Sequence, residues 1–217
     1  MSDENNDEFP RENQPPNLMR LAILVEGGLA LLAIFVGWLG LCAADQPLSQ
    51  VDSTIISSAF IWAALGMLPM LLILVAMLRM DFGIFRTMRQ TVDEMLVPLF
   101  AKCTVLDILL ISVLAGFGEE LFFRWCLQGG LAALISGPNG EVIALIVASV
   151  VFGLFHCINF SYIIVTTVIG LILGYMMIGS GTYLAPALAH GLYDFVALLY
   201  ILKRANWVKN SQIEENS

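Results

Sequence analysis

Several ionisable side chains stand out because they interrupt stretches of sequence that are otherwise dominated by Leu, Ile, Val, Phe and Ala. They comprise two adjacent carboxylates, one arginine, both histidines of the chain and one aspartate towards its C-terminal end. These residues are Glu119, Glu120, Arg124, His156, His190 and Asp194. An ionisable group inside a membrane segment costs several kcal/mol unless it is paired or faces water, so each of them is a functional candidate.

The residue types indicate hydrolysis by an activated water molecule. A carboxylate that faces a neutral imidazole can hold a water between the two groups and deprotonate it, which is general-base catalysis. Further hydrogen-bond donors can stabilise the oxyanion of a tetrahedral intermediate. Such a site requires neither a serine nor a cysteine nucleophile.

The spacing of the charged residues divides them into two roles. Glu120 and Arg124 are four residues apart, so they share one helical face and can form an ion pair. Glu119 is rotated from Glu120 by about 100° on the same helix. We therefore predict that Glu120 and Arg124 support the site and that Glu119 is the free carboxylate. His190 and Asp194 are also four residues apart and share a face.

Counting residues from the turns predicts that these groups meet at one depth. Glu119 and His156 each lie about 18 residues from the turn at Gly137, which is about 28 Å of helix. In an antiparallel helical hairpin they face each other. Asp194 lies about 14 residues, or about 21 Å, beyond the turn at Gly179–Gly181. We expect a shared polar cavity that also includes the histidine one turn before Asp194.

The composition is that of an integral membrane protein. Of 217 residues, 59% are hydrophobic and 13% are charged, whereas soluble domains average about 25% charged residues. The mean hydropathy is +0.84. Several apolar runs reach the roughly 20 residues needed to cross a hydrocarbon core about 30 Å thick. We predict an all-α polytopic bundle of about six membrane helices, at residues 18–43, 55–78, 105–135, 142–157, 162–178 and 184–202.

The chain divides into four parts. Residues 1–17 form an acidic tail that we expect to be disordered, and residues 18–99 hold two membrane helices and a basic segment. Residues 100–203 form the core with the candidate site, and residues 204–217 form a polar tail. Residues 79–102, at the boundary between the second and third parts, could form an amphipathic helix on the membrane surface. Lys and Arg gather there and after the last span, which predicts both termini in the cytoplasm.

Other charged and sulfur-containing residues carry less functional information. No basic and aromatic cluster of the kind that binds nucleic acid is present in the sequence. The four cysteines are isolated from one another and are expected to be buried thiols. Glu26 lies close to Arg20 near the start of the first span, so we expect it to be interfacial.

Three short motifs resemble those of a known family. The patterns E-E-x-x-x-R at Glu119–Arg124, F-x-x-x-H at Phe152–His156 and H-x-x-x-D at His190–Asp194 occur in order on apolar segments, where the third family pattern is H-x-x-x-N or a related residue. They are similar to those of the CPBP (CAAX protease and bacteriocin-processing, or Abi) family of intramembrane glutamate endopeptidases, which is related to the type II CAAX prenyl endopeptidase. The resemblance covers residues 100–203.

The resemblance implies roles for these residues. Glu119 and His156 would activate the water, and His190 with Asp194 would form the oxyanion side, supported by Glu120, Arg124 and Phe152. It implies an enzyme without a cofactor that cleaves a membrane-associated or lipidated peptide or protein, embedded among the lipids of a prokaryotic plasma membrane. One position differs, because Asp194 stands where well-studied members have Asn. An ionised Asp accepts hydrogen bonds but cannot donate one.

Alternatives from other classes remain open. Glu119, His156 and His190 could be the ligands of a zinc-dependent membrane hydrolase, although the H-E-x-x-H motif is absent. The polar cluster could instead bind a partner in a non-enzymatic immunity or scaffold protein. A transporter is disfavoured because the chain has no inverted repeat of interrupted helices. The sequence leaves the substrate, the cleavage site and the oligomeric state open.

Overall fold

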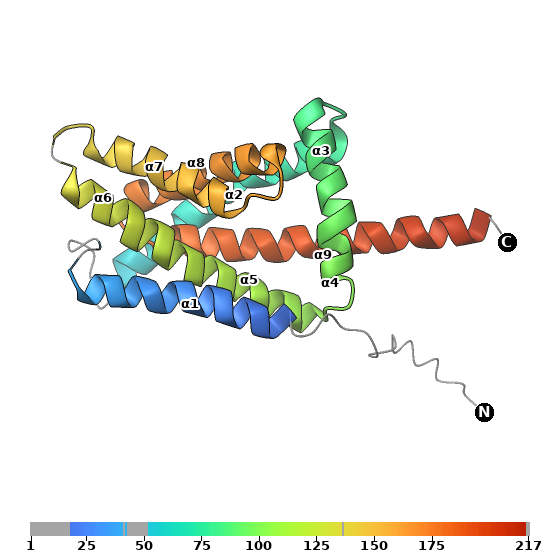
Figure 1. Ribbon diagram of the computed structural model, residues 1–217, viewed down its shortest axis with the longest axis horizontal. Coiled ribbons are helices and arrows are strands. Elements are labelled where there is room, and N and C mark those ends of the chain that lie inside the picture. The colour runs from blue at the N-terminus through green and yellow to red at the C-terminus, as the bar shows by residue number, and fades with distance from the viewer. Residues whose placement is uncertain (1–17, 41, 43–51, 136, 216–217) are drawn as a thin grey trace.

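The structure, a computed structural model, describes residues 18–40, 42, 52–135 and 137–215, and these form an all-α bundle (Figure 1). No strand occurs among them. In chain order, the helices are α1 (Leu18–Trp38), α2 (Ser53–Arg79), α3 (Gly83–Thr91), η2 (Val92–Leu96), α4 (Val97–Phe100), α5 (Val105–Glu120), η3 (Leu121–Gln128), α6 (Gly129–Leu134), α7 (Gly140–Phe155), α8 (Phe160–Ser180) and α9 (Leu184–Glu215). The predicted all-α membrane bundle is confirmed. The tail at residues 1–17 lies outside the described residues.

Polar residues at the membrane boundaries fix where the long helices begin. The side chain of Asp52 accepts a hydrogen bond from Ile55 N at the start of α2. Thr104 and Asp107 form a reciprocal capping box at the start of α5. Each cap satisfies a backbone N–H that has no partner within its helix. The apolar runs are therefore bounded by local hydrogen bonding as well as by hydropathy.

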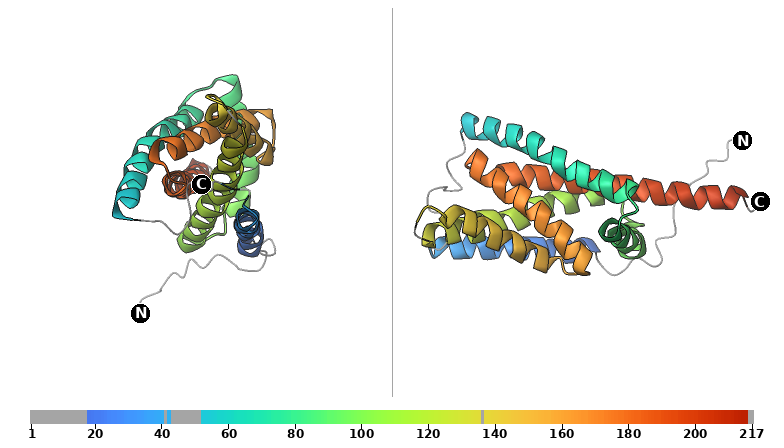
Figure 2. Two further views of the ribbon diagram at one scale, coloured as in Figure 1. Left: turned by 90° about the vertical axis from the view of Figure 1, so that its left-hand side faces the viewer. Right: turned by 90° about the horizontal axis from the view of Figure 1, so that it is seen from above.

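The long helices lie side by side, and the segment α3–η2–α4 crosses one end of the bundle (Figures 1 and 2). The axis of Gly83–Phe100 is bent by 115° from that of the continuous helix Val105–Leu134. The segment predicted to form a surface helix is therefore helical and transverse to the bundle. At the same end, α9 continues past α4 to Glu215, well beyond residue 202, where the sequence predicts the last span to end.

Four helices are long and apolar enough to cross a membrane, namely α1, α2, α8 and residues Leu184–Ala205 of α9. A fifth candidate is the bent pair Gly83–Phe100 and Val105–Leu134. The remaining predicted span, α7, has only 16 residues, or about 24 Å against a core of about 30 Å. The bundle thus contains each predicted span as a helix, while α7 falls short of a full crossing by length.

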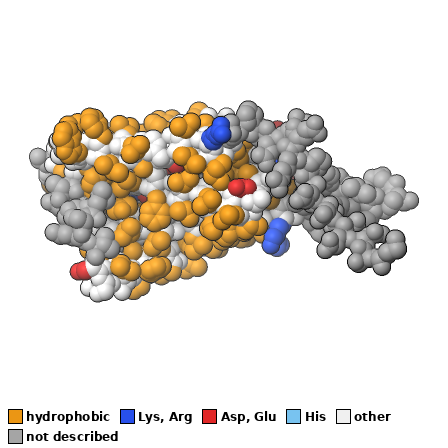
Figure 3. All heavy atoms as spheres, turned by 90° about the horizontal axis from the view of Figure 1, so that it is seen from below, with side chains coloured by type: hydrophobic (Ala, Val, Ile, Leu, Met, Phe, Trp, Pro, Cys, Tyr) orange, Lys and Arg blue, Asp and Glu red, His pale blue; other side chains and the backbone are white. Residues whose placement is uncertain are grey.

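The outer surface is apolar, as a lipid-facing surface must be. Large side chains such as Leu24, Phe60 and Leu72 are more than half exposed. The face drawn in Figure 3 is covered by hydrophobic side chains with only isolated charged ones. Water would solvate such a surface poorly. Together with the four candidate spans, this surface identifies an integral membrane protein.

Ion pairs and hydrogen bonds anchor the transverse segment to the bundle. Arg86 binds Asp81 through Nε and Nη2, each at 2.8 Å, and the hydrogen bond from Arg86 lowers the pKa of the Asp81 carboxyl. Arg204 of α9 pairs with Asp93 of η2. The α3 residue Thr91 accepts a hydrogen bond from Asn159, which lies between α7 and α8. The transverse segment is therefore tied to α8 and α9 as well as to its neighbours in sequence.

Candidate active site

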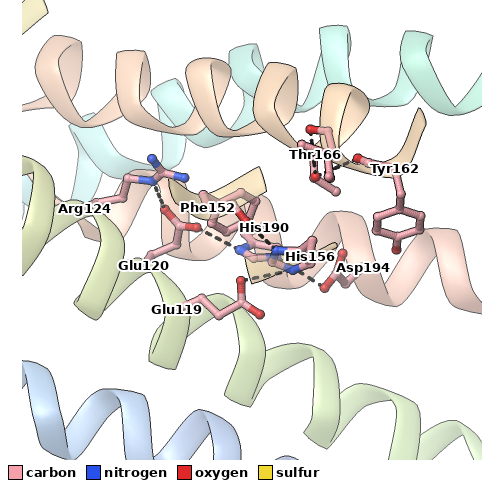
Figure 4. Close-up of polar contacts among 10 residues, drawn as sticks. Glu119, Glu120, Arg124, Phe152, His156, Tyr162, Thr166, His190 and Asp194 are labelled. Atoms are coloured by element: carbon pink, nitrogen blue, oxygen red, sulfur yellow. Dashed lines mark hydrogen bonds and ion pairs between the residues drawn. The ribbon is translucent and has the colours of Figure 1, made fainter. Parts of the chain in front are cut away.

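The structure brings the predicted site residues together from three parts of the chain (Figure 4). Glu119 and Glu120 are the last residues of α5, and His156 directly follows α7. His190 and Asp194 lie one turn apart on α9. Glycine allows this approach, because a Cβ on Gly116 would lie 2.6 Å from the backbone nitrogen of Gly191. The helices α5 and α9 therefore pack backbone to backbone beside the site.

Glu120 is the centre of a buried polar network. Its Oε2 accepts a hydrogen bond from Nε of Arg124 at 2.7 Å, and neither side chain is exposed. Its Oε1 accepts from Nδ1 of His190 at 2.9 Å. A buried carboxylate requires such partners, since an uncompensated charge there costs several kcal/mol. The predicted ion pair is present, and Glu120 also holds His190, a contact that the spacing did not predict.

Phe152 supports the network through its ring. The guanidinium carbon of Arg124 lies 5.0 Å from the ring centroid, within the range of a cation–π interaction. The same ring lies 4.5 Å from the His156 ring and 5.8 Å from the His190 ring, centroid to centroid. Phe152 thus separates the buried arginine from the two histidines and contacts all three.

His156 presents its second ring nitrogen to Glu119. Nδ1 lies 2.9 Å from the carbonyl oxygen of Phe152, and because a carbonyl only accepts, Nδ1 is the donor. In the neutral ring, Nε2 is therefore the unprotonated nitrogen, and it lies 3.6 Å from Oε2 of Glu119. That oxygen is buried without a hydrogen-bond partner among the described residues. Two unpaired acceptors that face each other are a place for a proton donor, and a water could donate to both of them if the side chains moved slightly apart.

The side chains assigned to catalysis are more exposed to solvent than the side chains that support them. The side chains of Glu120 and Arg124 are fully buried, whereas those of His156 and Asp194 are 27% and 32% exposed. Nε2 of His190 lies 3.4 Å from Oδ2 of Asp194, on this more open side. Water and a substrate can therefore approach Glu119 from the side of His156 and Asp194, while the ion pair stays sealed from solvent.

The backbone after Glu120 is a π-helix that the sequence did not reveal. The segment η3 begins at Leu121 and contains Arg124. A π-turn widens the helix and changes the direction in which the following side chains point, and such turns are frequent at functional sites. Propensities do not predict π-helices, so no signal in the sequence indicated it.

Glu26 is a second feature that the sequence analysis placed elsewhere. A Cβ on Gly118 would lie 2.5 Å from the carbonyl oxygen of Glu26, so α1 packs closely against the residue before Glu119. The Glu26 side chain is partly buried, and its Oε2 has no hydrogen-bond partner among the described residues. Glu26 thus lies against the site helix, not at a solvated interface with Arg20. Glu26 is the one acidic residue in an otherwise apolar span, and this feature of the sequence could have indicated a place near the site.

The described side chains do not favour the zinc alternative. Among the residues whose side chains the structure describes, no three His, Cys, Asp or Glu side chains are arranged so that they could hold a metal ion. Each ring nitrogen of His190 faces a carboxylate, Glu120 on one side and Asp194 on the other.

Comparison with protein families gives a match over part of the chain. Residues 101–196 match the family model described as type II CAAX prenyl endopeptidase Rce1-like. The match begins directly after α4 and ends within α9. It includes every residue of the network around Glu119 and Glu120, but none of α1 to α4. No curated protein and no solved structure gives a significant match.

Proposed function

We propose that this integral membrane protein is an intramembrane endopeptidase of the glutamate type. The match of residues 101–196 to the Rce1-like model of type II CAAX prenyl endopeptidases supports this proposal. It hydrolyses a peptide bond of a membrane-associated or lipidated peptide or protein. One observation carries the assignment of the base: the unpartnered Oε2 of Glu119 faces the unprotonated nitrogen of His156 at 3.6 Å.

In the proposed first step, a water between Glu119 and His156 loses a proton to the Glu119 carboxylate. The resulting hydroxide adds to the carbonyl carbon of the scissile bond, and the carbonyl π electrons move to the oxygen. General-base assistance of this kind contributes about 10² to 10⁴ in rate. The hydrogen bond from His156 Nδ1 to Phe152 keeps the ring oriented, so Nε2 is available to position the water.

In the second step, the tetrahedral intermediate collapses. The C–N bond breaks, the electrons on the oxyanion re-form the carbonyl, and the proton held by Glu119 passes to the leaving amine. His190 lies on the oxyanion side, where its Nε2 hydrogen is shared with Asp194, while Glu120 fixes the ring through Nδ1. Asp194 accepts from His190 and orients it. Glu120 and Arg124 compensate each other's charge and act as support.

The proposal requires no metal ion. A neutral water activated by Glu119 and His156 supplies the nucleophile, and protein donors stabilise the oxyanion. We therefore expect hydrolysis to continue in the presence of a chelator such as 1,10-phenanthroline. Loss of activity on chelation, with recovery on adding Zn²⁺, would instead support the zinc-dependent hydrolase.

The basic end of the bundle supports an orientation with both termini in the cytoplasm. Arg86, Arg89 and Arg204 lie at the end crossed by α3, where the chain also leaves the bundle through α9. Cytoplasmic membrane boundaries carry an excess of Lys and Arg. Cysteine accessibility at introduced sites in the α3 segment would test this orientation in intact cells.

The experiment for the function is a cleavage assay on the purified protein in lipid nanodiscs. Membrane-anchored peptides with and without a lipid group are incubated with the wild type and with Glu119→Ala and His156→Ala, and products are identified by mass spectrometry. We expect cleavage by the wild type and loss of cleavage in both variants. Full activity in either variant contradicts the mechanism. A wild type that cleaves nothing, yet retains its cellular effect in Glu119→Gln, favours the scaffold alternative.

A further inference from the structure

We propose that Tyr162 is a further catalytic residue, whose phenolic hydroxyl donates a hydrogen bond to the oxyanion of the tetrahedral intermediate beside Asp194. This inference rests on the proposed function. The Tyr162 hydroxyl would supply the hydrogen bond to the oxyanion that an ionised Asp194 cannot donate.

The other described groups leave the oxyanion side short of donors. An ionised Asp194 only accepts hydrogen bonds. His190 uses Nδ1 on Glu120, so only Nε2 remains, and it faces Asp194. Oxyanion sites stabilise the developing charge with donors that are already aimed at it, and each donor has a large effect on the rate. A second donor near Asp194 would complete such a site.

Tyr162 has the position for that role. It lies in the first turn of α8, and Figure 4 shows its ring beside Asp194 with the hydroxyl directed away from α8. The carboxyl groups of Asp194 and Glu119 both lie within electrostatic range of the phenol, so Tyr162 lies near the site. Its hydroxyl has no hydrogen-bond partner among the side chains that the structure describes, so its proton is available to a substrate.

The backbone of Tyr162 is held on both sides. Its N–H donates to Oδ1 of Asn159 at 2.9 Å, and its carbonyl accepts from Oγ1 of Thr166 at 2.7 Å. Asn159 is itself fixed, because its amide nitrogen donates to Thr91 of the transverse segment. A donor whose backbone is fixed loses little entropy when the intermediate forms, which is the requirement for preorganised stabilisation. Hydrogen bonds to Asn159 and Thr166 thus fix the backbone from which the phenol extends.

The test compares Tyr162→Phe with Tyr175→Phe. Tyr175 lies on the same helix, about 20 Å away along its axis, and its side chain is exposed outside the site. With the peptide that the wild type cleaves, we expect Tyr162→Phe to lower kcat by about 10²-fold, the usual loss for one oxyanion donor, with little change in KM. Tyr175→Phe should match the wild type. Both variants should keep the wild-type thermal midpoint, since neither substitution removes a hydrogen bond within the described structure.

A second substitution distinguishes catalysis from packing. Asn can donate from its amide, so Asp194→Asn in the Tyr162→Phe background should recover at least about tenfold in kcat, by supplying a new donor. A folded Tyr162→Phe protein with wild-type kcat would overturn this inference and leave the proposed function intact. A low kcat that Asp194→Asn does not raise would also overturn it. Absence of cleavage by the wild type would refute both the proposed function and the role of Tyr162.

Discussion

Oε1 of Glu120 lies 2.9 Å from Nδ1 of His190, so the carboxylate next to Glu119 holds the second histidine while Glu119 faces the first. Two adjacent residues thereby serve different helices. The fully buried glutamate is already satisfied by Arg124 and His190, whereas Oε2 of its neighbour has no partner among the described residues. This asymmetry is the basis for assigning the base to Glu119 and support to Glu120.

The buried ion pair predicts a non-additive effect on stability. Arg124→Met leaves Glu120 uncompensated in a site with no solvent exposure, so we expect a loss of about 3 to 5 kcal/mol in the free energy of unfolding. The double variant Glu120→Gln with Arg124→Met removes both charges and should lose less than Arg124→Met alone. Unfolding in detergent, followed by circular dichroism, measures both. Equal or greater destabilisation of the double variant would contradict this view of the pair.

Gly116 predicts a packing effect on activity. A Cβ there would lie 2.6 Å from Gly191 N and 2.7 Å from Ala187 O, both backbone atoms that cannot turn aside. Gly116→Ala should force α5 and α9 apart, lengthen the contact between Glu120 and His190, and cost about 1 to 3 kcal/mol. We expect lower peptide cleavage and a lower thermal midpoint.

Gly28→Ala is the matched control for Gly116→Ala. A Cβ on Gly28 would meet nothing within 4 Å, and it also lies within a membrane helix. Alanine favours helix over glycine by about 1 kcal/mol, so this variant should be as stable as the wild type or more so. If Gly28→Ala and Gly116→Ala lowered peptide cleavage and the thermal midpoint equally, close helix packing at Gly116 would not be the cause of the effect.

Much of the site could be predicted because residue counting gives depth along a helix. The distances of Glu119 and His156 from the turn at Gly137 predict that they face each other, and the structure places them 3.6 Å apart. The spacing of Glu120 and Arg124 likewise predicts their ion pair. Periodicity does not give the rotation of one helix about its axis relative to another. The contact between Glu120 and His190 depends on that rotation and was therefore missed.

The remaining omissions have related physical causes. The π-helix at Leu121–Gln128 changes the direction of the side chains after Glu120, and residue propensities carry no signal for it. Glu26 was expected at the membrane interface because it lies close to Arg20 in the sequence, near the start of the first span. Gly118 instead lets α1 pack closely against α5, the helix that carries Glu119. Tyr162 could not be singled out from sequence, since tyrosine is common at membrane interfaces.

Asp194 predicts different results for two substitutions. Asn keeps an oxygen that accepts from Nε2 of His190 and adds a donor, so Asp194→Asn should retain most of the peptide cleavage. Asp194→Ala removes the acceptor and leaves His190 without orientation on that side, so kcat should fall by at least about tenfold. Steady-state kinetics on the same peptide measure both. An inactive but folded Asp194→Asn would show that the negative charge is required.

Asp81 predicts a pH-dependent contact outside the membrane core. The hydrogen bond from Arg86 lowers the pKa of the Asp81 carboxyl in the folded protein. The ion pairs are therefore fully present above the pKa of an unpaired Asp and are lost as the pH falls through the lowered value. The carbon-13 resonance of the Asp81 carboxyl should titrate below its position in Arg86→Gln. An identical midpoint in the two proteins would contradict this contact.

The cleavage rate of Glu119→Gln is the most direct test of the assigned base, because glutamine keeps the shape of the side chain and cannot take the proton from water. Glu141→Gln, an exposed acid at the start of α7, is the control. With wild-type circular dichroism in both variants, we predict that Glu119→Gln loses at least about 10²-fold in kcat and Glu141→Gln loses nothing. A folded Glu119→Gln protein that cleaves the peptide at the wild-type rate would contradict the assignment of Glu119 as the general base.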